Sequence, residues 1–194
     1  MISSGLCVNN WIDSPEQCPS VDTLRPIVCS HCDGVTEGLG FHGHGTILRL
    51  LRVLKHGTAV VLELLVRRYK CCGCGHTVTV GPREMRSRYR YGLALIAFIL
   101  ASWSLDNRHP QSLRAQFCDM SRELSSTYER WPVLRRWGIK MGVLFGPRVP
   151  PRGDASVRTW VGRVTNWLDG YCPPESSGLE RPFRIAHAVR TMPF

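Results

Sequence analysis

Two hydrophobic runs stand out in the first half of the chain, residues 47–54 and 59–66, both rich in Val, Ile and Leu. The turn-forming residues 55–57 separate them. Such runs on either side of a short Gly-containing turn predict a β-hairpin. Arg49 and Arg52 lie three residues apart in the first run, and this spacing also suits one face of a short helix. A helix therefore remains an alternative for the first arm.

Apolar residues recur at helical spacing in the second half of the chain. The stretch 92–103 predicts a buried helix, and its 12 residues are fewer than the roughly 20 that cross a bilayer. Residues 112–118 and 128–144 predict two further helices. Residues 155–171 predict an amphipathic helix with Asp154 as its N-cap. Its apolar face is formed by Val157, Trp160, Val161, Val164, Trp167 and Leu168.

Two Cys-x-x-Cys pairs, Cys29/Cys32 and Cys71/Cys74, frame the predicted hairpin. One such turn supplies two ligands of a tetrahedral zinc ion, so two of them complete a four-ligand site. The glycines around the second pair permit the left-handed turns that such a knuckle requires. The spacer, residues 33–70, is longer than the roughly 15–20 residues of a compact ribbon, so we expect a long hairpin between the knuckles. The spacing predicts one structural zinc ion.

Other ligand sets remain open, because five further residues with suitable side chains lie near the two pairs. They are His31, His42, His44, Cys72 and His76. The alternatives are three cysteines with one histidine, or no metal, with the cysteines as buried thiols or disulfides. Residues 1–20 lack the basic start and apolar run of a signal peptide, and nine cysteines is an odd count. We therefore expect reduced thiols in a cytoplasmic protein.

These patterns together predict an α+β fold in five parts. We expect a loosely ordered arm over residues 1–26, a zinc ribbon over 27–82 and a mainly α-helical domain over 83–145. A Gly- and Pro-rich linker follows over 146–153, and then a C-terminal helix and tail over 154–194.

The formal net charge is +10, and residues 41–90 carry ten Arg and Lys against two acids. Such an excess favours a polyanionic partner, nucleic acid before an anionic membrane surface. Concentration of the charge beside the cysteine pairs favours DNA over the alternative of a generally solvated surface. We predict DNA contacts from Arg67, Arg68, Lys70, Arg83, Arg86, Arg88, Arg90, Arg135, Arg136 and Lys140.

Several of these features together resemble bacterial transposase-associated zinc-ribbon proteins. They are a Cys-x-x-Cys knuckle, the His42-Gly43 element, the basic strand and second knuckle of residues 67–75, and Gly81-Pro82 before an Arg- and Tyr-rich approach to a helix. The resemblance covers about residues 27–105. It implies DNA binding, zinc as a structural ion and a helix-turn-helix-like segment after the ribbon.

Full-length transposases of this kind carry three separated acidic residues on a nuclease sheet, and residues 106–194 have no strand-rich region to present them. The resemblance therefore implies a DNA-recognition or accessory component of a mobile genetic element, with a transposase or recombinase subunit as partner. The sequence contains no phosphate-binding loop, dinucleotide fingerprint or nucleophile elbow, so we expect no enzyme. The competing hypothesis is an adaptor that docks on a recombinase or polymerase through the ribbon and the Trp-bearing helices.

Overall fold

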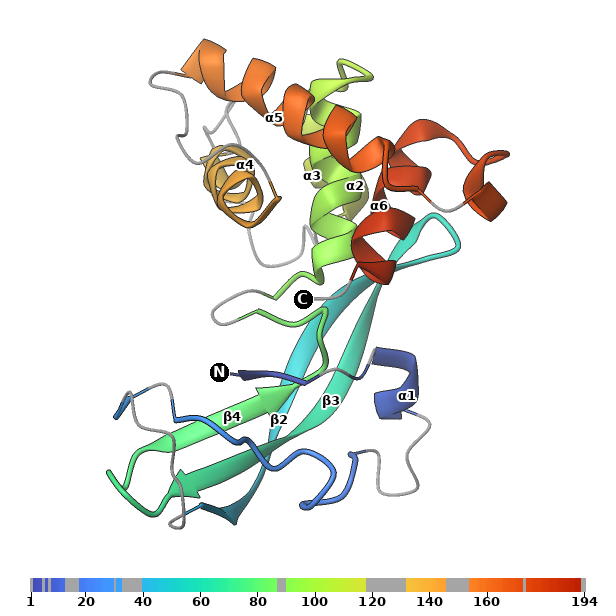
Figure 1. Ribbon diagram of the computed structural model, residues 1–194. Coiled ribbons are helices and arrows are strands. Elements are labelled where there is room, and N and C mark those ends of the chain that lie inside the picture. The colour runs from blue at the N-terminus through green and yellow to red at the C-terminus, as the bar shows by residue number, and fades with distance from the viewer. Residues whose placement is uncertain are drawn as a thin grey trace. The chain divides into compact units, whose positions relative to one another are not determined.

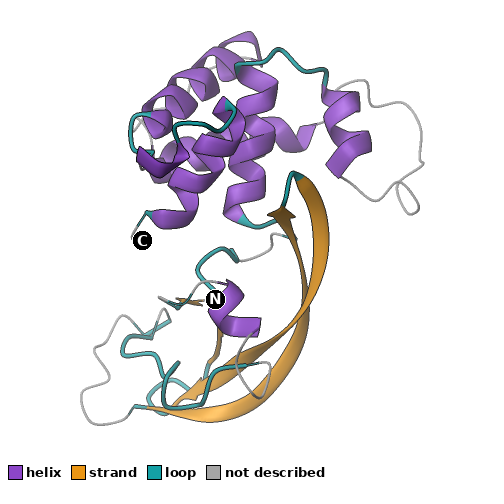
Figure 2. Ribbon diagram, turned by 90° about the vertical axis from the view of Figure 1, so that its right-hand side faces the viewer, coloured by secondary structure: helices purple, strands orange, loops and turns teal. Residues whose placement is uncertain are grey.

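The computed structural model describes residues 2–4, 6, 8–12, 18–29, 31–32, 40–86, 90–117, 132–145, 154–172 and 174–192. The chain forms two compact units. The first comprises Met1–Arg52, Val61–Gly92 and Pro193–Phe194, and the second comprises Val53–Val60 and Leu93–Met192. A β-sheet characterises the first unit and a group of helices the second (Figure 1, Figure 2), which confirms the predicted α+β class. The predicted linker, 146–153, lies outside the described residues.

Among the described residues, the sheet has four strands in the order β1-β4-β3-β2. The strands are β1 (Ile2–Ser3), β2 (Phe41–Lys55), β3 (Thr58–Cys71) and β4 (Thr77–Gly81). β4 pairs antiparallel with β3, with Tyr69 opposite Val78, and β1 pairs in parallel with β4. β2 and β3 form the predicted hairpin, and the first arm is a strand, not a helix. The strands extend beyond the apolar runs, so residues 41–45 belong to β2.

A two-residue turn, His56-Gly57, connects β2 to β3. Both residues have positive φ, 47° and 79°. Two central residues in the left-handed region are typical of a type I′ turn, whose twist matches that of the flanking strands. The hydroxyl of Thr58 also donates a hydrogen bond to the Lys55 carbonyl, at 2.9 Å. The local sequence therefore specifies the register of the long hairpin.

The N-terminal segment is anchored to the sheet through the short helix α1 (Val8–Ile12). Trp11 is fully buried, and its indole N–H donates to the Leu65 carbonyl at 2.8 Å. The buried Glu84 accepts a hydrogen bond from the Val8 N–H at 3.0 Å, which satisfies one of the free donors at the helix start. The described part of residues 1–26 is thus held against β3 and β4, where the sequence predicted a loosely ordered arm.

Five α-helices make up most of the described part of the second unit. They are α2 (Leu93–Ser104), α3 (Pro110–Phe117), α4 (Pro132–Phe145), α5 (Asp154–Asp169) and α6 (Arg181–Thr191), with the short 3-10 helix η2 (Pro174–Ser176) before α6. α2 is apolar all round, and residues 93–102 are all buried. The other four helices contact it. A helix without a polar face needs cover on several sides, and these neighbours supply it.

Two glycines let α4 lie close to α5. A Cβ atom at Gly142 would fall 1.5 Å from Cη2 of Trp160, and one at Gly138 would fall 2.5 Å from Cγ2 of Val161. Trp160 and Val161 are both buried. The backbone of α4 therefore occupies space that a larger residue would take from the α5 side chains.

Two features of this unit differ from the sequence predictions. Trp167, predicted on the apolar face of the 155–171 helix, is 45% exposed. The C-terminal tail, in which no helix was predicted, contains α6, on which Ile185, Ala188 and Val189 are buried. Among the described helices, none is long and apolar enough to cross a membrane.

Candidate metal centre

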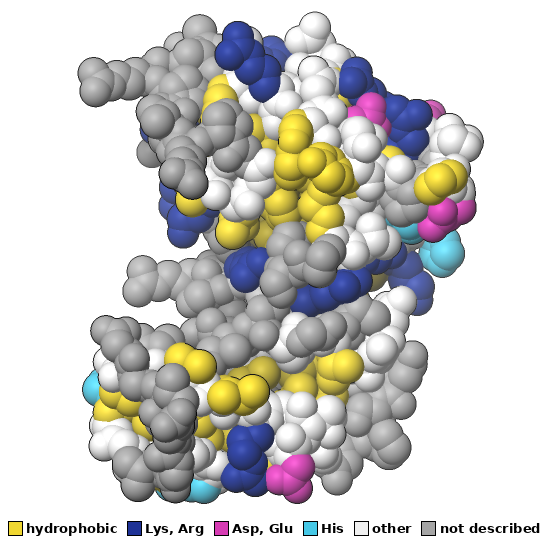
Figure 3. Space-filling model, viewed as in Figure 1, with side chains coloured by type: hydrophobic (Ala, Val, Ile, Leu, Met, Phe, Trp, Pro, Cys, Tyr) yellow, Lys and Arg dark blue, Asp and Glu magenta, His cyan; other side chains and the backbone are white. Residues whose placement is uncertain are grey.

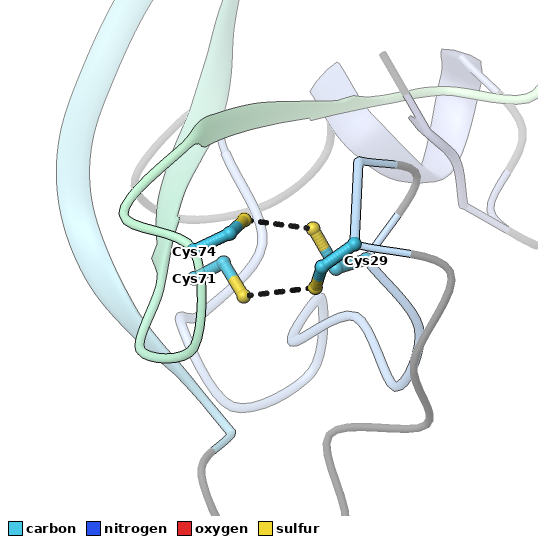
Figure 4. Close-up of side chains that lie close together, drawn as sticks. Cys29, Cys71 and Cys74 are labelled. Carbon is cyan, nitrogen blue, oxygen red and sulfur yellow. Dashed lines mark hydrogen bonds between the residues drawn. The ribbon is translucent and has the colours of Figure 1, made fainter.

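Four cysteines from two distant segments lie together at one end of the sheet. Cys71 is the last residue of β3 and Cys74 lies in the turn before β4, whereas Cys29 and Cys32 come from the segment that precedes β2. In Figure 4 the sulfur of Cys74 faces that of Cys29 across a short gap. The sulfur of Cys71 faces that of Cys32.

Backbone hydrogen bonds shape the second knuckle. The Gly75 N–H donates to the Cys71 carbonyl, and the Cys71 N–H donates to the His76 carbonyl, both at 2.9 Å. Gly75 has a φ of 71°, in the region that favours glycine. The turn therefore directs the side chains of Cys71 and Cys74 toward Cys29 and Cys32.

The distances between the sulfur atoms fit a tetrahedral metal ion. All four ligand atoms lie within 4.8 Å of one another. The Cys29–Cys74 and Cys32–Cys71 sulfur separations are 3.6 and 3.8 Å. Four sulfurs about 2.3 Å from a central zinc ion would lie about 3.8 Å apart, whereas disulfide sulfurs lie about 2.05 Å apart. The four cysteines are unbridged and could bind a metal ion.

The surroundings of Cys29 favour its thiolate form. The His31 N–H donates to the Cys29 sulfur at 3.4 Å, and this bond is the main cause that lowers the pKa of Cys29 from 9.0 to about 6. At Cys74 the N–H of His76 lowers the pKa, but burial and the sulfurs of Cys29 and Cys71 outweigh it and raise the pKa overall. Closely spaced thiolates repel one another, and a cation between them removes that repulsion.

The histidines near the cluster have other neighbours. The rings of His31 and His76 stack at 4.4 Å with an interplanar angle of 8°. Nδ1 of His42 lies 3.4 Å from the sulfur of Cys72. In the described part of the chain, the four cysteines form the one group of three or more metal-ligating side chains. The geometry therefore favours the four-cysteine set among the predicted alternatives.

The predicted DNA-contacting residues of the first unit fall on different surfaces. Arg67 and Tyr69 share one face of β3, whereas Arg68 and Lys70 share the other. The Arg67 side chain donates to the Pro19 carbonyl, so part of its hydrogen-bonding capacity serves the fold. Lys70 is exposed.

The segment before α2 holds four more of the predicted residues. Arg83 and Arg86 are half-buried, and Arg90 is exposed. Arg88 lies outside the described residues. The Arg90 carbonyl accepts a hydrogen bond from the Arg52 N–H at 2.7 Å, which joins the segment to β2.

In the second unit, Arg135, Arg136 and Lys140 are all exposed on α4. This helix contains no acidic residue. In the view of Figure 3, Lys and Arg side chains occur on both units. The basic surface is therefore distributed, and α4 carries its most compact predicted group.

Two exposed groups were not predicted from the sequence. Trp167 and Tyr171 form an aromatic pair with ring centroids 4.4 Å apart, and Tyr171 is 57% exposed. Their i, i+4 spacing was the available signal. The second group lies on the exposed side of α3 and consists of Gln111, Ser112 and Gln116. The spacing of Leu113 and Phe117, which are buried on the opposite side of the helix, could have predicted it.

Comparisons of the chain with protein-family models, with curated proteins and with solved structures gave no match.

Proposed function

We propose that this protein is a zinc-ribbon DNA-binding protein, a recognition or accessory component of a transposase-related mobile element without a nuclease domain of its own. The observation that carries the proposal is the four-cysteine cluster at the base of a long, basic hairpin. Zinc is the metal proposed, because four thiolates at tetrahedral spacing are a typical structural zinc site. The ion would hold the segment before β2 against the β3–β4 turn.

The charge of the chain supports DNA as the partner. A net charge of +10 attracts a polyanion, and DNA carries one negative charge for about every 1.7 Å of helix axis. The α4 residues Arg135, Arg136 and Lys140 are exposed along one helix without an acid among them. We assign them to phosphate contacts, together with the exposed Lys70 and Arg90.

The α2–α3 region is proposed as the helix-turn-helix-like unit. Residues 105–109 connect the two helices, and Asn107 has a φ of 57°, the conformation that glycine commonly provides in such turns. Phe117 of α3 packs edge-on against Phe98 of α2, with ring centroids 5.4 Å apart. The exposed Gln111 and Ser112 then offer hydrogen-bonding groups of the kind that read base edges.

The dependence of binding on salt tests the phosphate contacts. Fluorescence anisotropy with a labelled duplex should give a dissociation constant that rises steeply with salt concentration. The double variant Arg135→Ala/Arg136→Ala should flatten the log–log slope by about 1.8, since each phosphate contact contributes roughly 0.9. An unchanged slope in this variant would remove α4 from the interface, and salt-independent binding would refute the proposed function.

A charge-matched control distinguishes the loss of phosphate contacts from a general decrease in net charge. Arg25 is paired with Asp22 at 2.6 Å, and Arg181 is paired with Asp169 at 2.9 Å. The double variant Arg25→Ala/Arg181→Ala removes the same two charges from residues that already have acidic partners. Its salt slope should stay close to that of the wild type.

Base readout by α3 predicts a different signature. Gln111→Ala should reduce the preference for the selected target sequence and leave the salt slope unchanged, because base contacts specify whereas phosphate contacts position. Binding-site selection from a random duplex pool would supply the target sequence. A variant with full sequence preference would exclude Gln111 from base readout.

An adaptor that docks on a recombinase or polymerase is the second candidate, and the exposed Trp167–Tyr171 pair favours it. Exposed aromatic residues are typical anchors of protein interfaces. Such an interface should lose little affinity as salt increases, whereas DNA binding should lose much. Trp167→Ala should weaken capture by a partner without changing the DNA salt slope, if the adaptor function is the correct one.

A further inference from the structure

Cys72 lies inside the second knuckle but apart from the four-sulfur cluster. Its neighbour Cys71 is 1% exposed and joins the cluster, whereas Cys72 is exposed and does not. The sulfur of Cys72 lies 3.4 Å from Nδ1 of His42, which is also exposed. A thiol and an imidazole, two of the strongest metal-ligating side chains, therefore meet at the protein surface.

Their separation fits a shared metal ion. With a metal–sulfur distance of about 2.3 Å and a metal–nitrogen distance of about 2.0–2.1 Å, two ligands at a tetrahedral angle lie about 3.6 Å apart. The observed 3.4 Å agrees with this value to within the freedom of two surface side chains.

The backbone holds both ligands in place. The Cys72 N–H donates to the Gly40 carbonyl at 3.2 Å, which joins the knuckle to the residue before β2. His42 is the second residue of β2 itself. Because both side chains extend from hydrogen-bonded backbone, little backbone ordering is needed when a metal ion binds.

The neighbouring histidine pair does not offer the same geometry. The rings of His31 and His76 are nearly parallel, at 8°, and stacked at 4.4 Å. The lone pair of an imidazole nitrogen lies in the plane of its ring. The lone pairs of stacked rings therefore lie in separate, parallel planes and do not converge on one ion between the rings.

We propose that Cys72 and His42 form a second metal site, solvent-open and weaker than the four-cysteine centre. One thiolate and one imidazole suit a borderline or soft divalent ion such as Zn²⁺, Co²⁺ or Cd²⁺. Water completes the coordination, so the ion in this site is held less tightly and is removed by dialysis.

Cadmium binding to the full chain tests the proposal. With excess Cd²⁺ the wild type should bind two equivalents, of which one survives dialysis. In ¹¹³Cd NMR the two ions should give separate resonances, since one has four sulfur ligands and the other has one. Cys72→Ser and His42→Ala should each lose the second equivalent and its resonance, and each should keep the dialysis-resistant ion.

His44→Ala is the matched control. His44 is also an exposed histidine of β2, two residues from His42. This variant should bind two equivalents, as the wild type does. The proposal is overturned if the wild type binds a single equivalent in excess metal, if either site variant retains the second one, or if Cys72→Ser loses the dialysis-resistant ion. DNA binding takes no part in these measurements, so they test the metal site independently of the proposed function.

Discussion

Replacement of Gly142 by alanine should disrupt the packing of α4 against α5 and destabilise the protein. The new Cβ would fall 1.5, 1.9 and 2.4 Å from three carbons of the Trp160 ring, whereas carbon atoms in contact normally lie about 3.5–4.0 Å apart. The ring or the helix must therefore move by about 2 Å. Trp160 is only 5% exposed, so its ring has no solvent-filled space to enter.

The size of the effect follows from two opposing contributions. Overpacking of a core costs about 1–3 kcal/mol, and a rigid indole against a helix backbone belongs at the upper end. Alanine gains about 1 kcal/mol over glycine in a helix interior. The net loss of unfolding free energy is then about 2 kcal/mol. For a chain of this size that corresponds to a decrease in Tm of about 4–8 °C.

Thermal unfolding followed by circular dichroism at 222 nm measures this decrease. Gly162→Ala in α5 is the matched control, since its Cβ would meet its nearest neighbours at 3.9 Å, an ordinary contact distance. The control should keep the helix-propensity gain and raise Tm by about 2–4 °C. If Gly142→Ala matches the stability of the wild type or exceeds it, the close approach of the two helices is refuted.

A double-mutant cycle assigns the loss to Trp160. Within the part of the chain that the structure describes, the indole N–H of this residue has no hydrogen-bond partner. Trp160→Phe therefore removes ring volume without loss of a hydrogen bond. The smaller ring leaves room for the alanine methyl. The double variant Gly142→Ala/Trp160→Phe should therefore be less destabilised than the sum of the single variants, by about 1 kcal/mol or more. Additive losses would place the clash elsewhere.

Three further predictions concern the metal, the chemistry and the hairpin. Cys74→Ser should abolish metal binding and unfold the base of the β2–β3 hairpin, because binding free energy at such a site is folding free energy. Atomic emission would measure the metal content and circular dichroism the unfolding. Retained metal would contradict the assignment of Cys74 as a ligand. The purified chain should neither cut nor join supercoiled plasmid with Mg²⁺ or Mn²⁺. Plasmid cleavage that is abolished by a single Asp or Glu substitution would contradict this prediction. Gly57→Ala should lower stability by about 1–2 kcal/mol, since a φ of 79° strains any side chain. Gly178→Ala has open space and no positive φ, so its Tm should stay near the wild-type value.

The sequence predicts best where its signal is local. Hairpin and knuckles are specified by residues next to one another, such as the His56-Gly57 turn and each Cys-x-x-Cys pair, and the structure places all four cysteines together. The identity of the metal and the binding of DNA remain predictions. The spacer between the Cys-x-x-Cys pairs is longer than in a compact ribbon, yet the pairs still come together, because β2 and β3 extend through most of it.

Long-range packing is what the sequence did not reveal. Trp11 is a single aromatic residue in a polar segment, and the carbonyl that fixes it lies 54 residues away. The apolar positions of α6 alternate with arginines and small alanines, which weakens their periodicity. An indirect signal was available: the 92–103 stretch has no polar face, so it needs more covering helices than the three predicted at 112–118, 128–144 and 155–171.

The position of Trp11 also provides an optical reporter. It is the one tryptophan among six that falls in the sheet unit, since the other five lie between Leu93 and Met192. It is fully buried, with its indole N–H bonded to a β3 carbonyl, an environment that shifts emission to shorter wavelengths than solvent does. A chain with the other five tryptophans replaced by phenylalanine would emit tryptophan fluorescence from the sheet unit alone. The wavelength of the Trp11 emission maximum would then report opening of the sheet, and the helices would contribute no tryptophan emission.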